Sequence, residues 1–391
     1  MVYYNVMTNE GKFTAKIIYK ADDIAPDKWD EVFPSIAESY NFFRTLDQTT
    51  ADQFKNCYIT IYDGPDLVCI APCFIMDYPL ETTVEGPLRK IIETIKKVFP
   101  RFLCLRVLIC GASACEGRIG IKSHHVAAVM KKLIAVLFSL AHQEKTALIA
   151  FKDFPPTASS ILSPLRNIGF HEIQGYPSAV LPIRFKSFDE YLSSLSRSTR
   201  KDLKRKFAKT ADHTKIEMEI RNDLGEYLDY AYTLYINTLK KSEVRFEIMP
   251  KTFFRNISLN MPGETKYFLW KIDGKLAAFS LCLVKNRVLV DAYIGMDYAF
   301  AHKYHFYYLT FRDILIWCMK NGVMAYEAGA LNYDPKKRLD FNFIPQYVYA
   351  RHVNTVANFF FGGLCALIKP ENYDPLLKSL RTNEKKHSVN T

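Results

Sequence analysis

Apolar and polar positions follow two different patterns along the first half of the chain. Short runs rich in β-branched and aromatic residues, typical of strands, occupy residues 57–63 and 67–76 on the two sides of Gly64-Pro65. Because Gly-Pro marks a turn, this arrangement predicts a β-hairpin. Residues 125–142 carry apolar side chains three and four positions apart, which predicts an amphipathic helix.

The second half repeats this order of strands and helices. A helix is expected over residues 188–209, and another over 304–320 ends at Asn321-Gly322, a common C-cap. The strands predicted here cover residues 216–221, 266–272, 276–284, 288–294 and 323–327. Strands that alternate with helices indicate mixed sheets covered by helices.

Length and element order together predict two α/β domains. The chain has 391 residues, more than one core normally serves, and its 49% of hydrophobic residues can form two cores. Two successive units of roughly 180 residues with the same order of elements indicate a structural duplication. We expect an N-terminal domain over residues 1–185, a C-terminal domain over 186–368 and a polar tail over 369–391.

Net charge narrows the class of partner. A formal charge of +11 favours an anionic partner, such as the phosphates of a cofactor, a tRNA, an acidic carrier protein or a membrane surface. Nine scattered cysteines without a C-x-x-C pair support neither a zinc ribbon nor a thioredoxin-type motif. The N-terminus lacks the basic-then-apolar layout of a secretion signal, so we expect a cytoplasmic location.

An uncharged apolar stretch at residues 353–368 is too short and too rich in Asn and Gly to span a bilayer. We interpret it as a buried element, with peripheral membrane contact as the alternative.

The densest basic segment is RSTRKDLKRKFAK at residues 197–209, with seven Lys or Arg and one Asp. On a helix, Arg197, Lys201 and Lys204 share one face with Arg205, and Arg200 lies beside Lys204. Like charges at this spacing repel one another. The segment is therefore either a solvated helix face or a binding surface for a phosphate-bearing donor.

A second group of polar residues lies at strand and helix ends. The strand VLVDAYIG (288–295) is expected to place Asp291 and Tyr293 on one face. His305 falls in or near the first turn of the next helix, where free N–H groups attract anions. Glu327 ends the following strand. Open α/β sheets bind ligands at such strand ends, so these residues form the candidate site.

Four blocks of sequence resemble a known family. They are SFDEYLSSLSRSTRKDLKRK, YINTLKKSEVRFEIMPKTFF, GKLAAFSL and KYHFYYLTFRDILIWCMKNGVMAYEAGALNYDPKKRLDF, in this order. Together they resemble the FemAB-like branch of the GNAT-fold N-acyltransferases. The resemblance implies two tandem GNAT-like domains, of which the C-terminal one transfers an acyl or aminoacyl group to an amine. The matching positions are Asn237, Thr238, Lys240, Lys241, His305, Phe306, Glu327, Gly329, Ala330, Lys336 and Arg338.

The chain also departs from that family. Tyr307 stands where a Glu usually follows the His-Phe pair, and 331–335 replace a block that usually carries Gly and His. The segment AFAHKYHF (299–306) has no glycine, whereas a coenzyme A-binding GNAT protein carries a glycine-rich pyrophosphate loop there. This difference argues against coenzyme A as the donor.

Acyl transfer to an amine requires a base, donors for the developing oxyanion and an acid for the leaving group. We assign Glu327 as the base, directly or through a water, with Asp291 as the alternative. Strand amides around Tyr293 would polarise the carbonyl, and Tyr333 or His305 would serve the leaving group or its phosphates. The residues expected to hold an anionic donor are Arg197, Arg200, Lys201, Lys204, Lys336 and Arg338.

The co-substrate implied is an acyl-CoA, an acyl-carrier protein or an aminoacyl-tRNA, with no metal and no tightly bound cofactor. The alternative from another class is a catalytically inactive module that uses the same basic surface for nucleic acid or anionic lipid.

Overall fold

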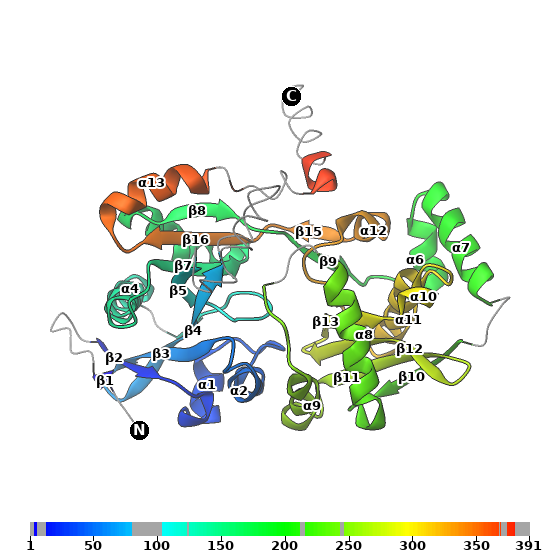
Figure 1. Cartoon of the computed structure of the whole chain (residues 1–391), viewed down its shortest axis with the longest axis horizontal. Coiled ribbons are helices and arrows are strands. Elements are labelled where there is room, and N and C mark those ends of the chain that lie inside the picture. The colour runs from blue at the N-terminus through cyan, green and yellow to red at the C-terminus, as the bar shows by residue number, and fades with distance from the viewer. Residues whose placement is uncertain are drawn as a thin grey trace, which may run out of the picture. The chain divides into compact units, whose positions relative to one another are not determined.

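A computed structural model describes residues 4–5, 13–79, 104–122, 125–211, 216–242, 246–366, 368 and 374–379. The chain forms two compact units (Figure 1). Unit 1 comprises residues 1–34, 50–175 and 345–378, and unit 2 comprises residues 35–49, 176–344 and 379–391.

Unit 1 is built on one sheet with the order β1-β2-β3-β4-β5-β7-β16-β8, and β6 pairs with β4. Its strands are β1 Tyr4–Asn5, β2 Phe13–Ile18, β3 Lys55–Asp63, β4 Asp66–Pro79, β5 Cys104–Cys110, β6 Gly120–Ile121, β7 Leu148–Phe154, β8 His171–Gln174 and β16 Tyr347–His352. Its helices are α1 Pro26–Val32, α4 Val126–Gln143, α5 Ser159–Leu162 and α13 Thr355–Cys365. The predicted hairpin is confirmed as β3 and β4, and β5 and β7 run parallel.

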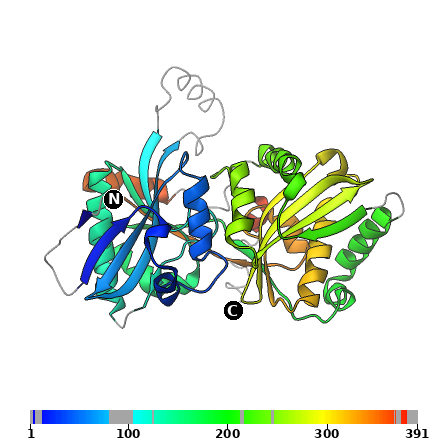
Figure 2. The same ribbon diagram turned by 90° about the horizontal axis from the view of Figure 1, so that it is seen from below.

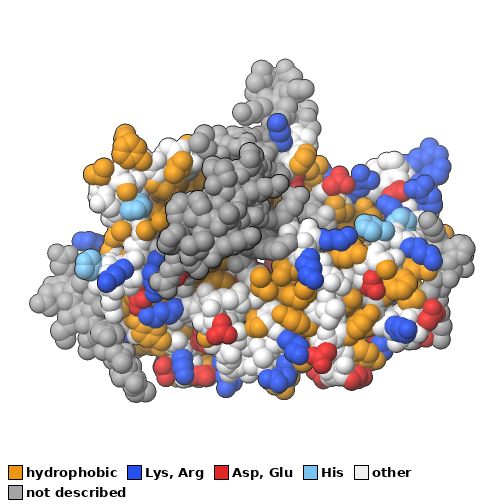
Figure 3. Space-filling view, in the orientation of Figure 1, with side chains coloured by type: hydrophobic (Ala, Val, Ile, Leu, Met, Phe, Trp, Pro, Cys, Tyr) orange, Lys and Arg blue, Asp and Glu red, His pale blue; other side chains and the backbone are white. Residues whose placement is uncertain are grey.

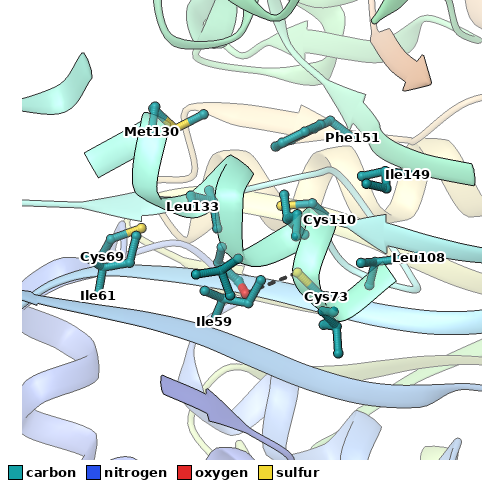
Figure 4. Close-up of a cluster of buried hydrophobic side chains, with 14 of the residues drawn as sticks. Ile59, Ile61, Cys69, Cys73, Leu108, Cys110, Met130, Leu133, Ile149 and Phe151 are labelled. Atoms are coloured by element: carbon teal, nitrogen blue, oxygen red, sulfur yellow. Dashed lines mark hydrogen bonds between the residues drawn. The ribbon is translucent and has the colours of Figure 1, made fainter. Parts of the chain in front are cut away.

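The core of unit 1 lies between its sheet and α4. Leu133 of α4 packs among Ile59, Cys73 and Phe151 from the strands (Figure 4). Within the described residues, α4 is the one helix long and apolar enough to cross a membrane. One side of α4 is nevertheless buried in this core, as in many core helices of the same length and composition.

Unit 2 contains the second sheet, with the order β10-β11-β12-β13-β14-β9-β15. Its strands are β9 Ser178–Pro182, β10 Ile216–Arg221, β11 Thr265–Ile272, β12 Lys275–Lys285, β13 Val288–Met296, β14 Ala325–Glu327 and β15 Asn342–Ile344. Its helices are α2 Tyr40–Thr49, α6 Phe188–Ser194, α7 Arg197–Ala211, α8 Leu228–Lys241, α9 Lys251–Asn260, α10 Tyr298–Ala301, α11 Phe306–Lys320 and α12 Tyr333–Arg338. Figure 2 shows this sheet between α8 and α9 on one side and α7 and α11 on the other.

The two sheets share one plan, so the predicted mixed sheets covered by helices and the predicted duplication are both present. Each sheet has an antiparallel series leading to one parallel pair, β5 with β7 in unit 1 and β13 with β14 in unit 2. A long helix connects the two strands of each pair. The next strand of each sheet comes from elsewhere in the chain, because β16 lies between β7 and β8 while β9 lies between β14 and β15.

This exchange of strands divides the chain differently from the expected 1–185 and 186–368. β9 precedes residue 186 but pairs with β14 and β15, and β16 follows unit 2 but pairs with β7 and β8. Residues 35–49 also join unit 2, where Asn260 of α9 donates to Thr45 of α2 at 2.9 Å. Most of the expected tail, 369–391, lies outside the described residues.

The interpretation of residues 353–368 as a buried element is wrong. The segment forms α13, and both Phe359 and Phe360 of this helix are exposed. An uncharged sequence favours burial only where a neighbouring element covers it, and the described neighbours β8 and β16 cover one side of α13.

Candidate active site

The two central strands of unit 2 separate part-way along their length. β13 and β14 pair in parallel from Val288 opposite Ala325 to Val290 opposite Glu327. β14 ends there, while β13 continues to Met296 and, among the described strands, pairs only with β12 over those last residues. This separation leaves backbone groups of β13 without a strand partner on one edge, at the strand ends where the sequence predicted the site.

A β-bulge lies at the same place in β13. Tyr293 pairs with Leu281 and Asp291 pairs with Cys282, so Ala292 is an extra residue in the ladder. An extra residue reverses the alternation of side chains. The expectation that Asp291 and Tyr293 share a face is therefore wrong.

Side-chain contacts confirm that reversal. Tyr293 packs edge-on against Tyr235 of α8 and against Phe253 and Phe254 of α9. Asp291 bonds to Tyr326, whose ring stacks on Phe311 of α11. The two residues thus belong to opposite faces of the sheet.

Asp291 accepts hydrogen bonds from three neighbouring side chains. The hydroxyl of Ser280 donates to Oδ1 and that of Tyr326 donates to Oδ2 at 2.7 Å, while the Cys282 thiol is 3.8 Å from Oδ1. Burial raises the pKa of Asp291, and the hydrogen bonds from Ser280 and Tyr326 oppose that shift. The carboxyl is therefore held by internal partners.

Ser280 and Tyr326 are not among the residues that the sequence pattern indicated. Ser280 is the one polar residue of the apolar strand segment AAFSLCLV, which was the available signal. Tyr326 could be placed beside Asp291 only from the register of β13 and β14, which is not visible in either strand alone.

Lys336 lies inside the loop that follows β14. Its buried ammonium donates to the backbone carbonyls of Ala328, Gly329, Ala330 and Leu331 at 2.7–3.1 Å. Burial lowers the pKa of Lys336 to about 8, against the attraction of Asp291. All protons of this ammonium are donated to carbonyls of the loop. The expectation that Lys336 holds an anionic donor is therefore wrong, and Lys336 anchors the loop instead.

Two further expected site residues have internal partners. The buried Tyr333 donates its hydroxyl proton to the carbonyl of Pro177 at 2.9 Å, so it supports the loop and is not placed to protonate a leaving group. Arg338 pairs with Asp334 at 3.1 Å on the surface of α12.

Glu327 and His305 are less enclosed. Glu327 is half-buried, and because adjacent strand residues alternate, it faces the side opposite Tyr326, which is the side of Tyr293. His305 caps the N-terminus of α11 with a left-handed backbone, φ 51°, and its carbonyl accepts from Tyr308 at 2.9 Å. Its predicted position at the start of the helix is confirmed.

The single helix expected over residues 188–209 is wrong, because Leu195 has an extended backbone and separates α6 from α7. The basic segment lies on α7, and its charges divide into two groups. Arg205 and Lys206 pair with Asp202, and Arg200 donates to the carbonyl of Ser193 at 3.1 Å. The second group is exposed and makes no ion pair or hydrogen bond with any described residue. It consists of Arg197, Lys201 and Lys204. Figure 3 shows Lys and Arg side chains gathered over this part of unit 2.

The sequence of the chain matches the model of a protein family. The family model FemAB-like, described as peptidoglycan biosynthesis or recognition, matches residues 97–359. The chain belongs to the FemAB-like family. The match covers residues 176–344 of unit 2 and parts of unit 1 before and after them.

Among solved structures, that of FemX has a TM-score of 0.54 at 13% identity, and the match covers 83% of this chain and 96% of FemX. A tandem GNAT protein from the clavulanic acid biosynthesis pathway has a TM-score of 0.49 at 10% identity, with 87% and 99% covered. The expected fold of two α/β units with mixed sheets covered by helices is confirmed by the two sheets themselves, and FemX shares this fold.

Curated relatives of two Mycobacterium tuberculosis strains, provisionally named 8-amino-7-oxononanoate synthase 2, are 26% identical over 331 residues. That match covers 80% of this FemAB-like chain and 42% of each relative, so the chain spans less than half of their length.

Proposed function

We propose that this FemAB-like protein is an N-acyltransferase that moves an acyl or aminoacyl group from an activated donor to an amine. The observation that carries the proposal is the separation of β13 from β14 at a bulge. Backbone N–H groups on the unpaired edge of β13 can donate to an acyl oxygen, which is the stabilisation that acyl transfer requires.

The residues around this point divide the chemistry between them. Glu327 takes a proton from the acceptor amine, whose nitrogen attacks the acyl carbon. A C–N bond forms, and the bond from the acyl carbon to the donor's sulfur or oxygen breaks. The proton that the leaving group needs comes from His305 or from water.

Two sets of hydrogen bonds fix the backbone on either side of this point. Lys336 holds the carbonyls of 328–331 inward and so fixes the loop that follows Glu327. Thr238 of α8 accepts from the backbone N–H of Met296 at 3.1 Å, which ties the end of β13 to α8. A transfer site needs such fixed surroundings, because small displacements of the reacting groups cost large factors in rate.

The anionic part of the donor is assigned to α7. Arg197, Lys201 and Lys204 carry the exposed charges on this helix that the described residues do not neutralise. They suit the phosphates of a coenzyme A thioester, a carrier protein or an aminoacyl-tRNA.

The proposal is tested by presenting the purified chain with two donor panels, acyl-CoA thioesters and charged tRNAs, and a mixture of primary amines. Transfer is followed by mass spectrometry of the acceptors. A mass increase equal to the donated acyl group, abolished by boiling the protein, supports the proposal. Tight donor binding without any transfer would instead indicate the inactive binding module.

A further inference from the structure

Helix α13 of unit 1 presents an apolar surface that the described residues leave uncovered. The exposed fractions of its large apolar side chains are 70% for Val356, 80% for Phe359, 69% for Phe360 and 61% for Leu364. Figure 3 shows hydrophobic side chains gathered over this helix. An exposed Phe pair on a fixed helix is unusual, because apolar side chains of this size are normally buried.

The other side of α13 is fastened to unit 1. The buried Asn358 accepts from the backbone N–H of His352 at 2.9 Å and donates to the carbonyl of Gly169 at 2.9 Å. Gly362 approaches the ring of His171 so closely that a Cβ there would lie 2.5 Å from it. The helix is thus held in place with its apolar side outward.

The size of this surface fits a lipid interface better than a protein partner. The four side chains expose roughly 500 Å², since a Phe side chain carries about 150–250 Å². A stable protein interface needs ~800 Å² on each partner. The helix has 11 residues, about 16 Å, so it is too short to cross a hydrocarbon layer of ~30 Å and suited to lie within its surface.

Charge around α13 favours anionic headgroups. No Asp or Glu occurs in the sequence from Phe341 to Pro370, whereas this stretch contains Arg351, His352 and Lys369. Glu172 in the adjacent strand β8 is paired with Arg166. Because α13 itself has no charged residue, it offers no ion pair to a protein surface, whereas the net charge of +11 on the chain favours a negatively charged membrane.

We propose that α13 docks this protein on an anionic lipid surface, with Val356, Phe359, Phe360 and Leu364 inserted at the boundary between headgroups and acyl chains. This docking does not depend on the transfer chemistry proposed above. It would bring a soluble donor and a membrane-bound amine to the same place.

The test uses vesicles and the full chain. We expect the chain to sediment with phosphatidylglycerol–phosphatidylcholine vesicles and several-fold less with vesicles of phosphatidylcholine alone. The double variant Phe359→Ser, Phe360→Ser should lower the partition coefficient at least about tenfold, because most of the inserted area is lost. A matched control, Tyr230→Ser with Leu259→Ser, removes exposed apolar side chains from α8 and α9 and should bind as the wild type does.

A fluorescence reading checks insertion directly. Trp29 and Trp270 are fully buried and Trp317 is half-buried, and the wild-type protein carries the same three tryptophans and so supplies the background. Against it, a Phe359→Trp variant should shift its emission to shorter wavelength on addition of the anionic vesicles. Wild-type protein that stays in solution, or a double variant that sediments like the wild type, overturns the proposal. A wild-type dimer that becomes monomeric in the double variant overturns it in favour of contact between two copies.

Discussion

At the scale of single residues, Glu327 and Asp291 differ in what surrounds them. Asp291 accepts hydrogen bonds from two hydroxyl groups on the α11 side of the sheet. Glu327 is half-buried and lies on the side of Tyr293. Glu327→Gln keeps the shape and removes the charge. If Glu327 is the base, turnover should fall by ~10²–10⁴-fold with donor affinity unchanged, as measured by transfer kinetics and donor titration.

The matched control for that variant is Glu219→Gln. Glu219 pairs with Lys271 at the surface of β10 and β11, so the same change there should leave turnover within a few-fold. Unchanged turnover in Glu327→Gln would show that the amine loses its proton elsewhere, and Asp291→Asn would then be the variant to measure.

The buried carboxyl of Asp291 predicts a dependence of stability on pH. Burial raises the pKa of Asp291 in the folded protein above the ordinary value of 3.8, which the unfolded chain keeps. At a pH between the unfolded and the folded pKa, the folded protein therefore holds a proton that the unfolded chain has released. The free energy of unfolding should therefore fall as pH rises through this interval. Asp291→Asn cannot ionise and should lack that fall.

Urea unfolding at several pH values between about 4 and 8 tests this difference. As pH rises, the free energy of unfolding of Asp291→Asn should increase relative to that of the wild type. Parallel curves would mean that the hydrogen bonds from Ser280 and Tyr326 outweigh burial and hold the pKa of Asp291 at its ordinary value.

Residue patterns indicated which strands carry the candidate site but not which way their side chains point. DAY at 291–293 has the alternation of a regular strand, and the bulge arises only from its register with β12. The internal use of Lys336 could not be predicted either, because its four carbonyl partners belong to a loop whose path depends on Gly329, Leu331 and Asn332 at positive φ.

At the scale of elements, the exchanged strands β9 and β16 are the part that local pattern could not assign. Each is short and its sequence is compatible with either sheet, so its place depends on pairing with strands far away in the chain. The hairpins and the long helices were predictable, because their periodicity and turn residues are local. The start of the 304–320 helix, for example, falls two residues from that of α11.

Proline substitutions test the exchange of strands. Val180 lies in β9 opposite Glu327 and Asn342, so Val180→Pro should disrupt the sheet of unit 2, at a cost of about 3 kcal/mol or more. Hydrogen exchange should rise in β14 and β15 while β7 and β8 stay protected.

Val348→Pro in β16 is the reciprocal variant. Val348 pairs with Ile173, so exchange should rise in β8 and β7 and remain low in β14. If either substitution loosened the opposite unit, the pairing of β9 and β16 would be wrong.

At the scale of the whole molecule, a net charge of +11 favours an anionic partner, and α7 is the clearest local candidate for contact with it. Replacing Arg197, Lys201 and Lys204 together by Ala should weaken donor binding. The melting temperature should barely change, because exposed charges contribute ~0–1 kcal/mol each to stability. Removing Lys20, Lys122 and Lys275 instead takes away the same charge elsewhere and should leave donor binding unchanged.

The salt dependence of donor binding then distinguishes the donor classes. Each phosphate contact contributes about 0.7–0.9 to the slope of log affinity against log salt concentration. For a tRNA donor that lies along the helix, the triple variant should reduce the slope by up to about three such contributions. The remaining slope should still be steep because of the other phosphate contacts. A coenzyme A thioester carries few phosphates, so its wild-type slope should be shallow and should nearly vanish in the variant. An unchanged slope for both donors, with affinity also unchanged, would show that α7 is a solvated helix face and that the donor's phosphates bind elsewhere.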